Sequence, residues 1–79
     1  MPKAAPDKPP IRFSGKRLLE WRRVNNMSRS RLARAIDFIV GEHQIIRYEK
    51  GQCVPDYDTA QAIARALNIS LEDLSDAAR

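Results

Sequence analysis

The chain has 79 residues, of which 43% are hydrophobic and 30% charged, and its formal net charge is +4. This length predicts one small domain, and no apolar run approaches the roughly 20 residues of a membrane span. The opening MPKAAPDKPP lacks the apolar segment of a secretory signal, so we expect a cytoplasmic protein. The lone Cys53 excludes an internal disulfide, and the lone His43 has no partner at metal-ligand spacing.

Catalytic patterns are absent from the sequence. It contains no glycine-rich phosphate loop, no paired catalytic carboxylates and no nucleophile–base pattern. We therefore expect a protein that is not an enzyme and uses no cofactor, metal or small-molecule substrate.

The charges are divided unevenly along the chain. Residues 1–50 hold 12 Lys and Arg against 5 Asp and Glu, a net charge of +7, whereas residues 51–79 hold 2 against 5, a net charge of −3. A basic front and an acidic back favour the approach of a polyanion from one side.

Residues 1–13 are predicted to form a flexible basic arm, and residues 14–79 the folded domain. Proline at the density found in this segment prevents a helix and favours extended, solvated chain. The prolines are Pro2, Pro6, Pro9 and Pro10, and the basic residues are Lys3, Lys8 and Arg12.

A first helix is predicted from about Ser14 to Asn25-Asn26, and a second begins after Ser28. Each serine can accept a hydrogen bond from the free N–H groups of the first turn, and the Asn-Asn pair suits a helix end. Apolar residues recur at helical spacing after each serine. They are Leu18, Trp21 and Val24 in the first helix, and Leu32, Ala33 and Ile36 in the second.

Three more helices are predicted in the second half of the chain. One runs from about Glu42 to Lys50 and stops at Gly51, another opens at Pro55-Asp56, and the last is a short helix capped by Ser70. The inward faces are Ile45 and Tyr48, followed by Tyr57, Ala60, Ile63, Ala64 and Leu67. No strand pattern appears. The sequence therefore predicts an all-α, compact domain of five helices with short connections.

A series of short motifs runs through these predicted helices. They are Leu18, Trp21-Arg22, Met27-Ser28, Leu32-Ala33, Ile45, Arg47-Tyr48-Glu49-Lys50-Gly51, Pro55, Ala62-Ile63-Ala64-Arg65-Ala66-Leu67 and Ile69-Ser70-Leu71-Glu72-Asp73-Leu74. Their order and spacing resemble the phage-repressor family of helix-turn-helix domains, the Cro/Xre-like group. The resemblance covers about Ser14 to Leu74. It implies a five-helix, lambda-repressor-like fold whose third helix enters the DNA major groove.

The connection between the second and third helices is longer than in that family. Ala33 and Ile45 are twelve residues apart, where the family has ten. Forcing the usual spacing would bury His43 without a partner, which is costly, so two extra residues are placed near Phe38-Ile39. The glycine of the family's turn then falls on Asp37, which adopts left-handed backbone more readily than most residues.

The extra residues make Phe38-Ile39-Val40 an unusually apolar connection. Two interpretations remain open. Either these side chains extend the core under the turn, against Leu19 or Trp21, or they form an exposed apolar knob that contacts a partner protein or a second copy of the domain.

The resemblance makes the third helix the recognition helix, so residues near its start are the candidate base contacts. Arg47 can donate two hydrogen bonds to a guanine edge, and Gln44 can pair with adenine. His43 can donate or accept according to its tautomer, and Glu42 can accept from a cytosine amino group, although it repels phosphate. Ile46 suits either a thymine-methyl contact or a packing role.

Candidate phosphate contacts lie at helix starts and ends. Ser28 and Arg29 open the second helix, where backbone N–H groups and the helix dipole favour an anion. The resemblance implies a phosphate contact for Arg29 and for Lys50 at the end of the third helix. Lys16, Arg17 and the basic residues of the arm could add diffuse contacts.

Arg22 and Glu49 match family positions that resemble a buried ion pair between the first helix and the end of the third. We expect this pair to be structural, because losing one partner would leave an unpaired buried charge.

These features predict a sequence-specific, DNA-binding transcriptional regulator, a repressor of phage or mobile-element type that binds double-stranded DNA. A weak or DNA-dependent homodimer is expected, with no membrane association. Two alternatives remain. An antitoxin-type DNA binder would need a toxin-binding segment, for which only the Pro-rich arm is available. A protein-interaction adaptor would use the fold without DNA and would lack polar residues on its recognition helix.

Overall fold

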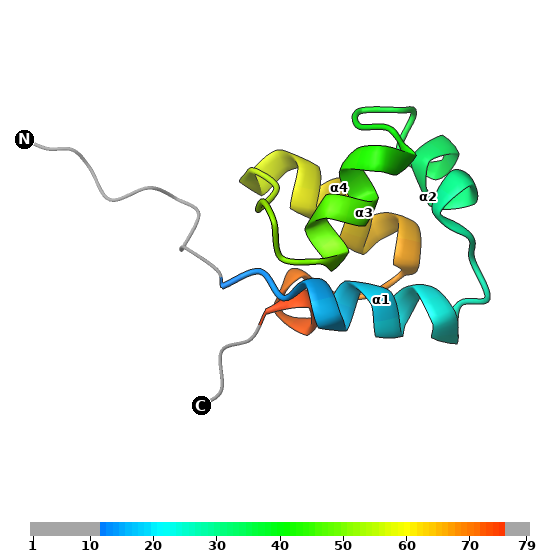
Figure 1. Ribbon diagram of the computed structural model, residues 1–79. Helices are drawn as coiled ribbons and strands as arrows, with labels where there is room; N and C mark the ends of the chain where they lie inside the picture. Colours follow the sequence, from blue (N-terminus) through cyan, green and yellow to red (C-terminus); the bar gives the residue numbers. More distant parts are fainter. Residues whose placement is uncertain (1–11, 76–79) are drawn as a thin grey trace, which may run out of the picture.

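The computed structural model describes residues 12–75, which form four α-helices and one short 3₁₀ helix (Figure 1). The elements are α1 (Gly15–Val24), α2 (Arg29–Ala35), α3 (Glu42–Glu49), α4 (Tyr57–Leu67) and the 3₁₀ helix η1 (Leu71–Leu74). The all-α prediction is therefore confirmed. The prediction of five helices is corrected to four helices and a 3₁₀ turn, because Ser75 returns to extended backbone after only four residues.

Side-chain caps begin most of these elements, as the sequence predicts. The capping oxygen of the residue before the helix accepts a hydrogen bond from a backbone N–H three residues on. The pairs are Ser14–Arg17, Ser28–Arg31 and Asp56–Thr59 at 3.2, 3.1 and 2.8 Å. Ser70 and Asp73 bond each other's backbone N–H groups in a capping box that fixes η1. Helix α3 follows Gly41 and has no side-chain cap.

Each α-helix ends at a residue with left-handed backbone. These residues are Asn26, Asp37, Gly51 and Asn68, with φ of 56°, 57°, 76° and 61°. The N–H groups at and just after each of them bond carbonyls in the last helical turn, which satisfies groups that would otherwise be free. The left-handed conformation predicted for Asp37 is confirmed.

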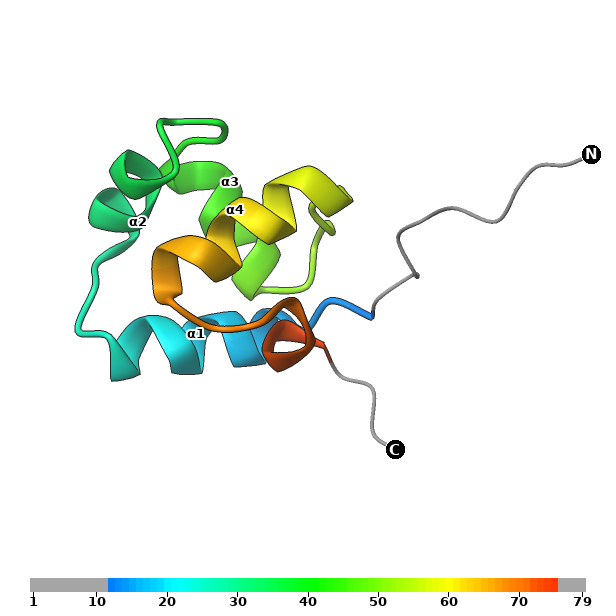
Figure 2. The same cartoon turned by 180° about the vertical axis from the view of Figure 1, so that it is seen from behind.

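The core lies where α4 crosses behind α3, with α1 along one side and α2 at one end (Figures 1 and 2). Its fully buried large side chains are Leu18, Leu32, Ile45, Ile63, Leu67 and Leu74. One residue that the helical spacing predicts to face the core is exposed instead. Val24 is 72% exposed, because it is the last residue of α1 and the chain turns away directly after it.

The two ends of the described chain meet. Phe13 and Ser75 form an isolated antiparallel β-bridge, and the backbone N–H of Ser14 donates to the carbonyl of Leu74 at 2.8 Å. The ring of Phe13 also packs edge-on against Tyr48, with centroids 6.0 Å apart. Phe13 therefore belongs to the folded domain, although the sequence division placed it in the arm. Residues 1–11 of that arm lie outside the described residues.

Gly15 allows the start of α1 to touch the end of α3. A Cβ atom at Gly15 would lie 2.1 Å from the carbonyl oxygen of Tyr48 and 2.7 Å from that of Glu49. Both neighbours are backbone atoms, so they cannot move aside by a change of rotamer. The absence of a side chain at Gly15 therefore sets the distance between α1 and α3.

We expect Gly15→Ala to lower the free energy of unfolding by at least about 2 kcal/mol, because the added methyl overpacks a backbone contact. Thermal denaturation followed by circular dichroism measures this loss. Gly41→Ser is the matched control, since no atom lies within 4 Å of a Cβ there and serine is a good capping residue. An unchanged melting temperature for Gly15→Ala would show that the helices can separate at little cost.

Candidate nucleic-acid interface

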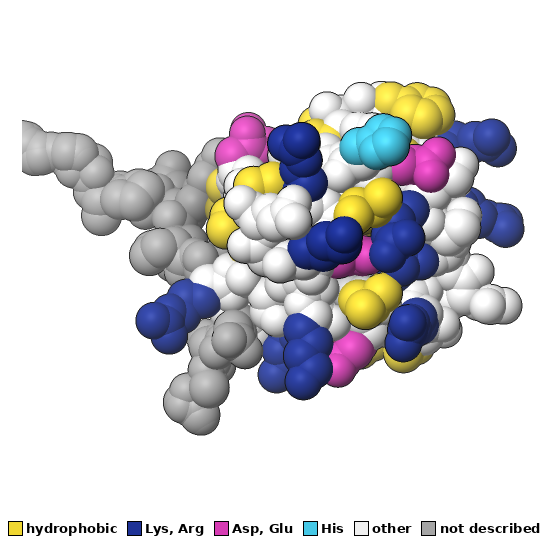
Figure 3. All heavy atoms as spheres, in the orientation of Figure 1, with side chains coloured by type: hydrophobic (Ala, Val, Ile, Leu, Met, Phe, Trp, Pro, Cys, Tyr) yellow, Lys and Arg dark blue, Asp and Glu magenta, His cyan; other side chains and the backbone are white. Residues whose placement is uncertain are grey.

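Helix α3 presents one buried face and one polar face. Ile45 and Tyr48 are buried against the core, whereas Glu42, His43 and Arg47 are exposed. Figure 3 shows that Lys and Arg side chains gather on the side of the molecule that carries α3, around a few hydrophobic and acidic side chains. Three of the four predicted base contacts therefore share an open surface.

The fourth predicted base contact, Gln44, is half-buried and held within the protein. Its Nε2 donates a hydrogen bond to Sγ of Cys53 at 3.1 Å. Burial raises the pKa of Tyr48 above its ordinary value, and the hydrogen bond from Gln44 opposes that shift without overcoming it. Cys53 thus positions a residue of α3, a role that the sequence alone did not indicate.

The ion pair expected between Arg22 and Glu49 is present. Nε of Arg22 lies 2.7 Å from Oε2 of Glu49, and Nη2 donates to Oε1 at 3.4 Å. The same guanidinium donates from Nη1 to the carbonyl of Met27 at 3.0 Å. The side chains are 12% and 3% exposed, so water cannot replace these bonds. This contact ties α1 to the end of α3 and to the segment before α2.

A second arginine shares the same carboxylate. Nε of Arg29 donates to Oε1 of Glu49 at 3.0 Å, while the Arg29 side chain remains 40% exposed. The sequence assigned Arg29 to phosphate contact alone, and the structure adds this structural bond. Glu49 therefore connects α1, α2 and α3, and one edge of the Arg29 guanidinium stays open to solvent.

The remaining predicted phosphate contacts lie around the same helices. Ser28 is exposed and its hydroxyl caps α2, while Lys50 is exposed at the end of α3. Lys16 and Arg17 are exposed in the first turn of α1, which the Gly15 contact holds beside the last residues of α3. The fold thus collects these basic groups at the end of α3 and at the start of α2.

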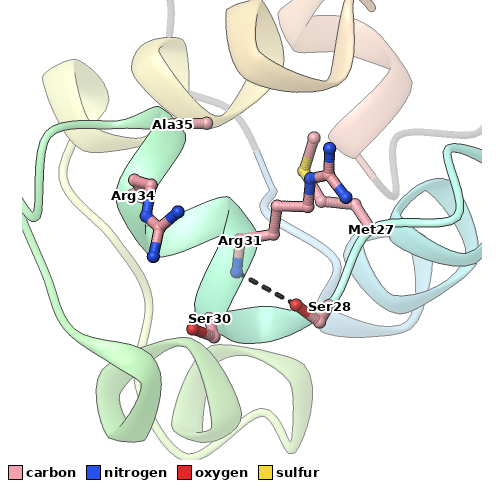
Figure 4. Close-up of a pocket in the computed structure, with 6 residues that line it drawn as sticks. All are labelled: Met27, Ser28, Ser30, Arg31, Arg34 and Ala35. Carbon is pink, nitrogen blue, oxygen red and sulfur yellow. Dashed lines mark hydrogen bonds between the residues drawn. The ribbon is translucent and has the colours of Figure 1, made fainter.

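An open recess lies along α2. It is lined by Met27, Ser28, Ser30, Arg31, Arg34 and Ala35. Figure 4 shows the Arg31 side chain extending toward Met27, and Arg34 lying close to α2 further along the helix. No role for Arg31 or Arg34 was predicted from the sequence. Their charges and the neighbouring hydroxyl groups give this side of α2 a basic surface with hydrogen-bond donors.

The apolar connection between α2 and α3 lies largely outside the core. Phe38 is 65% exposed and Ile39 55% exposed, and only Val40 packs against the core. The interpretation in which all three side chains extend the core is therefore wrong.

Within residues 12–75, no group of three or more potential ligand side chains could hold a metal ion. None of the helices in this part of the chain is long and apolar enough to cross a membrane.

Comparison with known proteins identifies the class to which this arrangement belongs. A family model described as Helix-turn-helix (HTH_3) matches residues 18–74. The chain therefore belongs to this helix-turn-helix family, the Xre/Cro-like group. The match spans α1 to η1, which confirms the resemblance seen in the motifs. The family binds DNA and is not enzymatic. A search of curated proteins gave no significant match.

Two solved structures share the fold. The P22 c2 repressor in complex with a synthetic operator superposes with a TM-score of 0.73 at 20% identity, covering 82% of this chain and 96% of that one. ComR from S. thermophilus, in complex with DNA and its signalling peptide ComS, gives a TM-score of 0.73 at 32% identity and covers 82% of this chain. This chain spans only 22% of ComR. Both solved structures contain DNA.

The two arginines bonded to Glu49 should differ in their effect on stability. Arg22→Ala removes three hydrogen bonds and a nearly buried charge, so we expect a loss of about 3 kcal/mol in the free energy of unfolding. Arg29→Ala removes one bond from a partly exposed side chain, so we expect about 1 kcal/mol. Urea denaturation of the two variants measures both losses. Equal midpoints would contradict the assignment of Arg22 as the principal partner of Glu49.

Proposed function

We propose that the protein is a sequence-specific, DNA-binding transcriptional regulator, a repressor of phage or mobile-element type that acts in the bacterial cytoplasm. The observation that carries this proposal is the exposed polar face of α3. This face is held rigidly by buried Ile45 and Tyr48 and by the Glu49 ion pairs. A rigid helix with an open polar face and basic surroundings suits the major groove of double-stranded DNA. The DNA in both matched structures supports the same partner.

Base reading is assigned to the exposed face of α3, to residues of its first turn and to Arg47 one turn later. Arg47 can donate two hydrogen bonds to guanine O6 and N7, and Glu42 can accept from a cytosine amino group. His43 is exposed beside them and can donate or accept. Gln44 reads DNA only with the part of its amide that Cys53 and Tyr48 leave accessible, so its freedom to choose a base is restricted.

Phosphate binding is assigned to groups on either side of α3. Ser28 and the exposed edge of Arg29 lie at the start of α2, the helix that crosses the DNA backbone in helix-turn-helix complexes. Lys50, Lys16 and Arg17 lie at the other end of α3. The mechanism is occupancy: the bound domain covers a site that polymerase would otherwise use.

Two domains on DNA would bind half-sites about one helical turn, roughly 34 Å, apart. The proposal includes a weak or DNA-dependent homodimer, because such half-sites hold two copies side by side. The exposed polar residues of α3 weigh against an adaptor that uses the fold without DNA.

Selection of bound duplexes from a random DNA pool tests the proposal. Enrichment of one motif would support it, and the symmetry of the motif would report how many domains bind. Absence of any enriched motif would favour the adaptor.

Binding to the selected duplex should depend strongly on salt. If about six phosphates are neutralised per domain, the slope of log K against log salt concentration should lie near −5. Fluorescence anisotropy between about 50 and 200 mM salt measures the slope. Affinity that does not change with salt would contradict the electrostatic part of the proposal.

Arg47 and Lys50 should have different effects on sequence preference. Arg47→Ala should weaken the best site by about 1–3 kcal/mol and relax the preference at one base pair, because it removes a base contact. Lys50→Ala should weaken all sites alike and flatten the salt slope by about 1, because it removes a phosphate contact. Anisotropy titrations on the selected site and on its single-base variants measure both effects.

The reverse outcome has a definite meaning. If preference is lost in the Lys50 variant and kept in the Arg47 variant, the residues of α3 that face the bases have been misassigned.

A further inference from the structure

The two extra residues of the helix-turn-helix connection form an exposed apolar pair. Phe38 and Ile39 expose 65% and 55% of their surface, although both are large hydrophobic side chains. The neighbouring Val40 packs against the core, so the exposure belongs to these two positions and not to the whole connection.

The backbone holds this pair outside the core. Asp37 and Phe38 both have φ of 57°, and a bulky side chain in left-handed backbone is a genuine outlier. The N–H of Phe38 donates to the carbonyl of Ala33 at 2.8 Å, and that of Ile39 to the carbonyl of Ile36 at 3.2 Å. The loop is thus tied to the last turn of α2. A residue kept in a costly conformation by its surroundings indicates a functional constraint.

The apolar pair lies beside the start of the recognition helix. The loop that carries it projects beyond α2 and α3 at the top of Figure 1, directly before Glu42. In Figure 3 hydrophobic side chains appear at that same edge, next to the cyan histidine on the face that carries α3. When α3 lies in the major groove with its N-terminal residues at the base edges, this loop lies at the groove as well.

The exposed area argues against a second copy of the domain as the occupant. Two side chains exposed to this degree present on the order of 200 Å² together. A standard protein–protein interface buries about 800 Å² on each partner. The pair alone is too small to hold two domains together, whereas it is large enough to cover a few methyl groups.

We propose that Phe38 and Ile39 read thymine methyl groups in the major groove, next to the base pairs that α3 contacts. This inference rests on the proposed DNA binding and adds a determinant of specificity. The C5-methyl group of thymine is the apolar feature of the major groove, and apolar side chains recognise it by contact. The preference would be for thymine over cytosine at one or two positions beyond those read by Arg47.

Uracil substitution tests this contact directly. In the duplex selected by the unaltered protein, each thymine in turn is replaced by uracil, which pairs with adenine but lacks the methyl group. At the positions covered by the apolar pair, binding should weaken about fourfold per methyl lost, the effect of exposing one buried methyl group. Fluorescence anisotropy gives the dissociation constant for each duplex.

The doubly substituted protein, Phe38→Ala with Ile39→Ala, identifies the side chains responsible. It should bind the thymine duplex more weakly than the unaltered protein does, and it should bind the uracil and thymine duplexes equally at those positions. Val54→Ala is the matched control. Val54 is an apolar residue exposed to 66% that lies between α3 and α4, and its loss should leave the thymine-to-uracil ratio unchanged. Thymine methyls read by Ile46 would keep their effect in the double variant.

The failures are distinguishable. If the unaltered protein selects a motif but no uracil substitution weakens binding, or if the double variant keeps the same sensitivity, the methyl-reading role is overturned while DNA binding stands. If the double variant loses only cooperativity between two bound copies, the pair is a protein contact and the proposal is overturned. If no duplex is selected at all, both the DNA-binding function and this inference fail.

Discussion

The structure depends on one buried carboxylate. Glu49 is 3% exposed and lies at the end of α3, where it accepts hydrogen bonds from Arg22 of α1 and Arg29 of α2. An isolated buried carboxylate would be very costly, and two guanidinium groups offset that cost. The result is a fixed orientation of the recognition helix relative to the two helices that precede it. The base reading proposed for α3 requires such rigidity, because hydrogen bonds to bases depend on position within fractions of an ångström.

The Glu49 cluster also divides the basic residues into two groups. Arg22 is fully used inside the protein, whereas Arg29 is shared between the carboxylate and solvent. Arg47 on α3 and Lys50 directly after it are exposed side chains within two residues of Glu49. At the end of α3, the buried structural charge of Glu49 therefore lies between two exposed basic side chains that a polyanion could reach.

Local chemistry made much of the fold predictable from the sequence. Ser14, Ser28 and Ser70 each cap the element that follows, because the hydroxyl can bond a backbone N–H without help from the rest of the fold. The left-handed backbone of Asp37 was predictable because Asp37 occupies the place of the glycine in the family's turn. By contrast, the short fifth helix predicted after Ser70 is a single 3₁₀ turn, since a capping box does not reveal which kind of helix follows it. Val24 fits the helical spacing of the inward residues, but it is the last residue of α1 and is exposed.

Contacts within the candidate site were less predictable, because they depend on how helices approach one another. The bond from Arg29 to Glu49 requires the start of α2 to lie against the end of α3, which no local pattern specifies. The bond from Gln44 to Cys53 forms because the chain reverses after Gly51 and returns along α3. Hydrophobicity alone could not decide whether Phe38 was buried, since its exposure follows from a left-handed backbone that sequence statistics disfavour.

The bridge between Phe13 and Ser75 has a consequence for how this fold can be used in larger proteins. Because the chain enters and leaves the domain at adjacent points, the unit behaves as a closed module with a single attachment point. Such a module can be joined to other domains at either end, or inserted within one, without pulling its helices apart. In ComR the matching region is 22% of the chain, so the same fold there forms one part of a much longer protein.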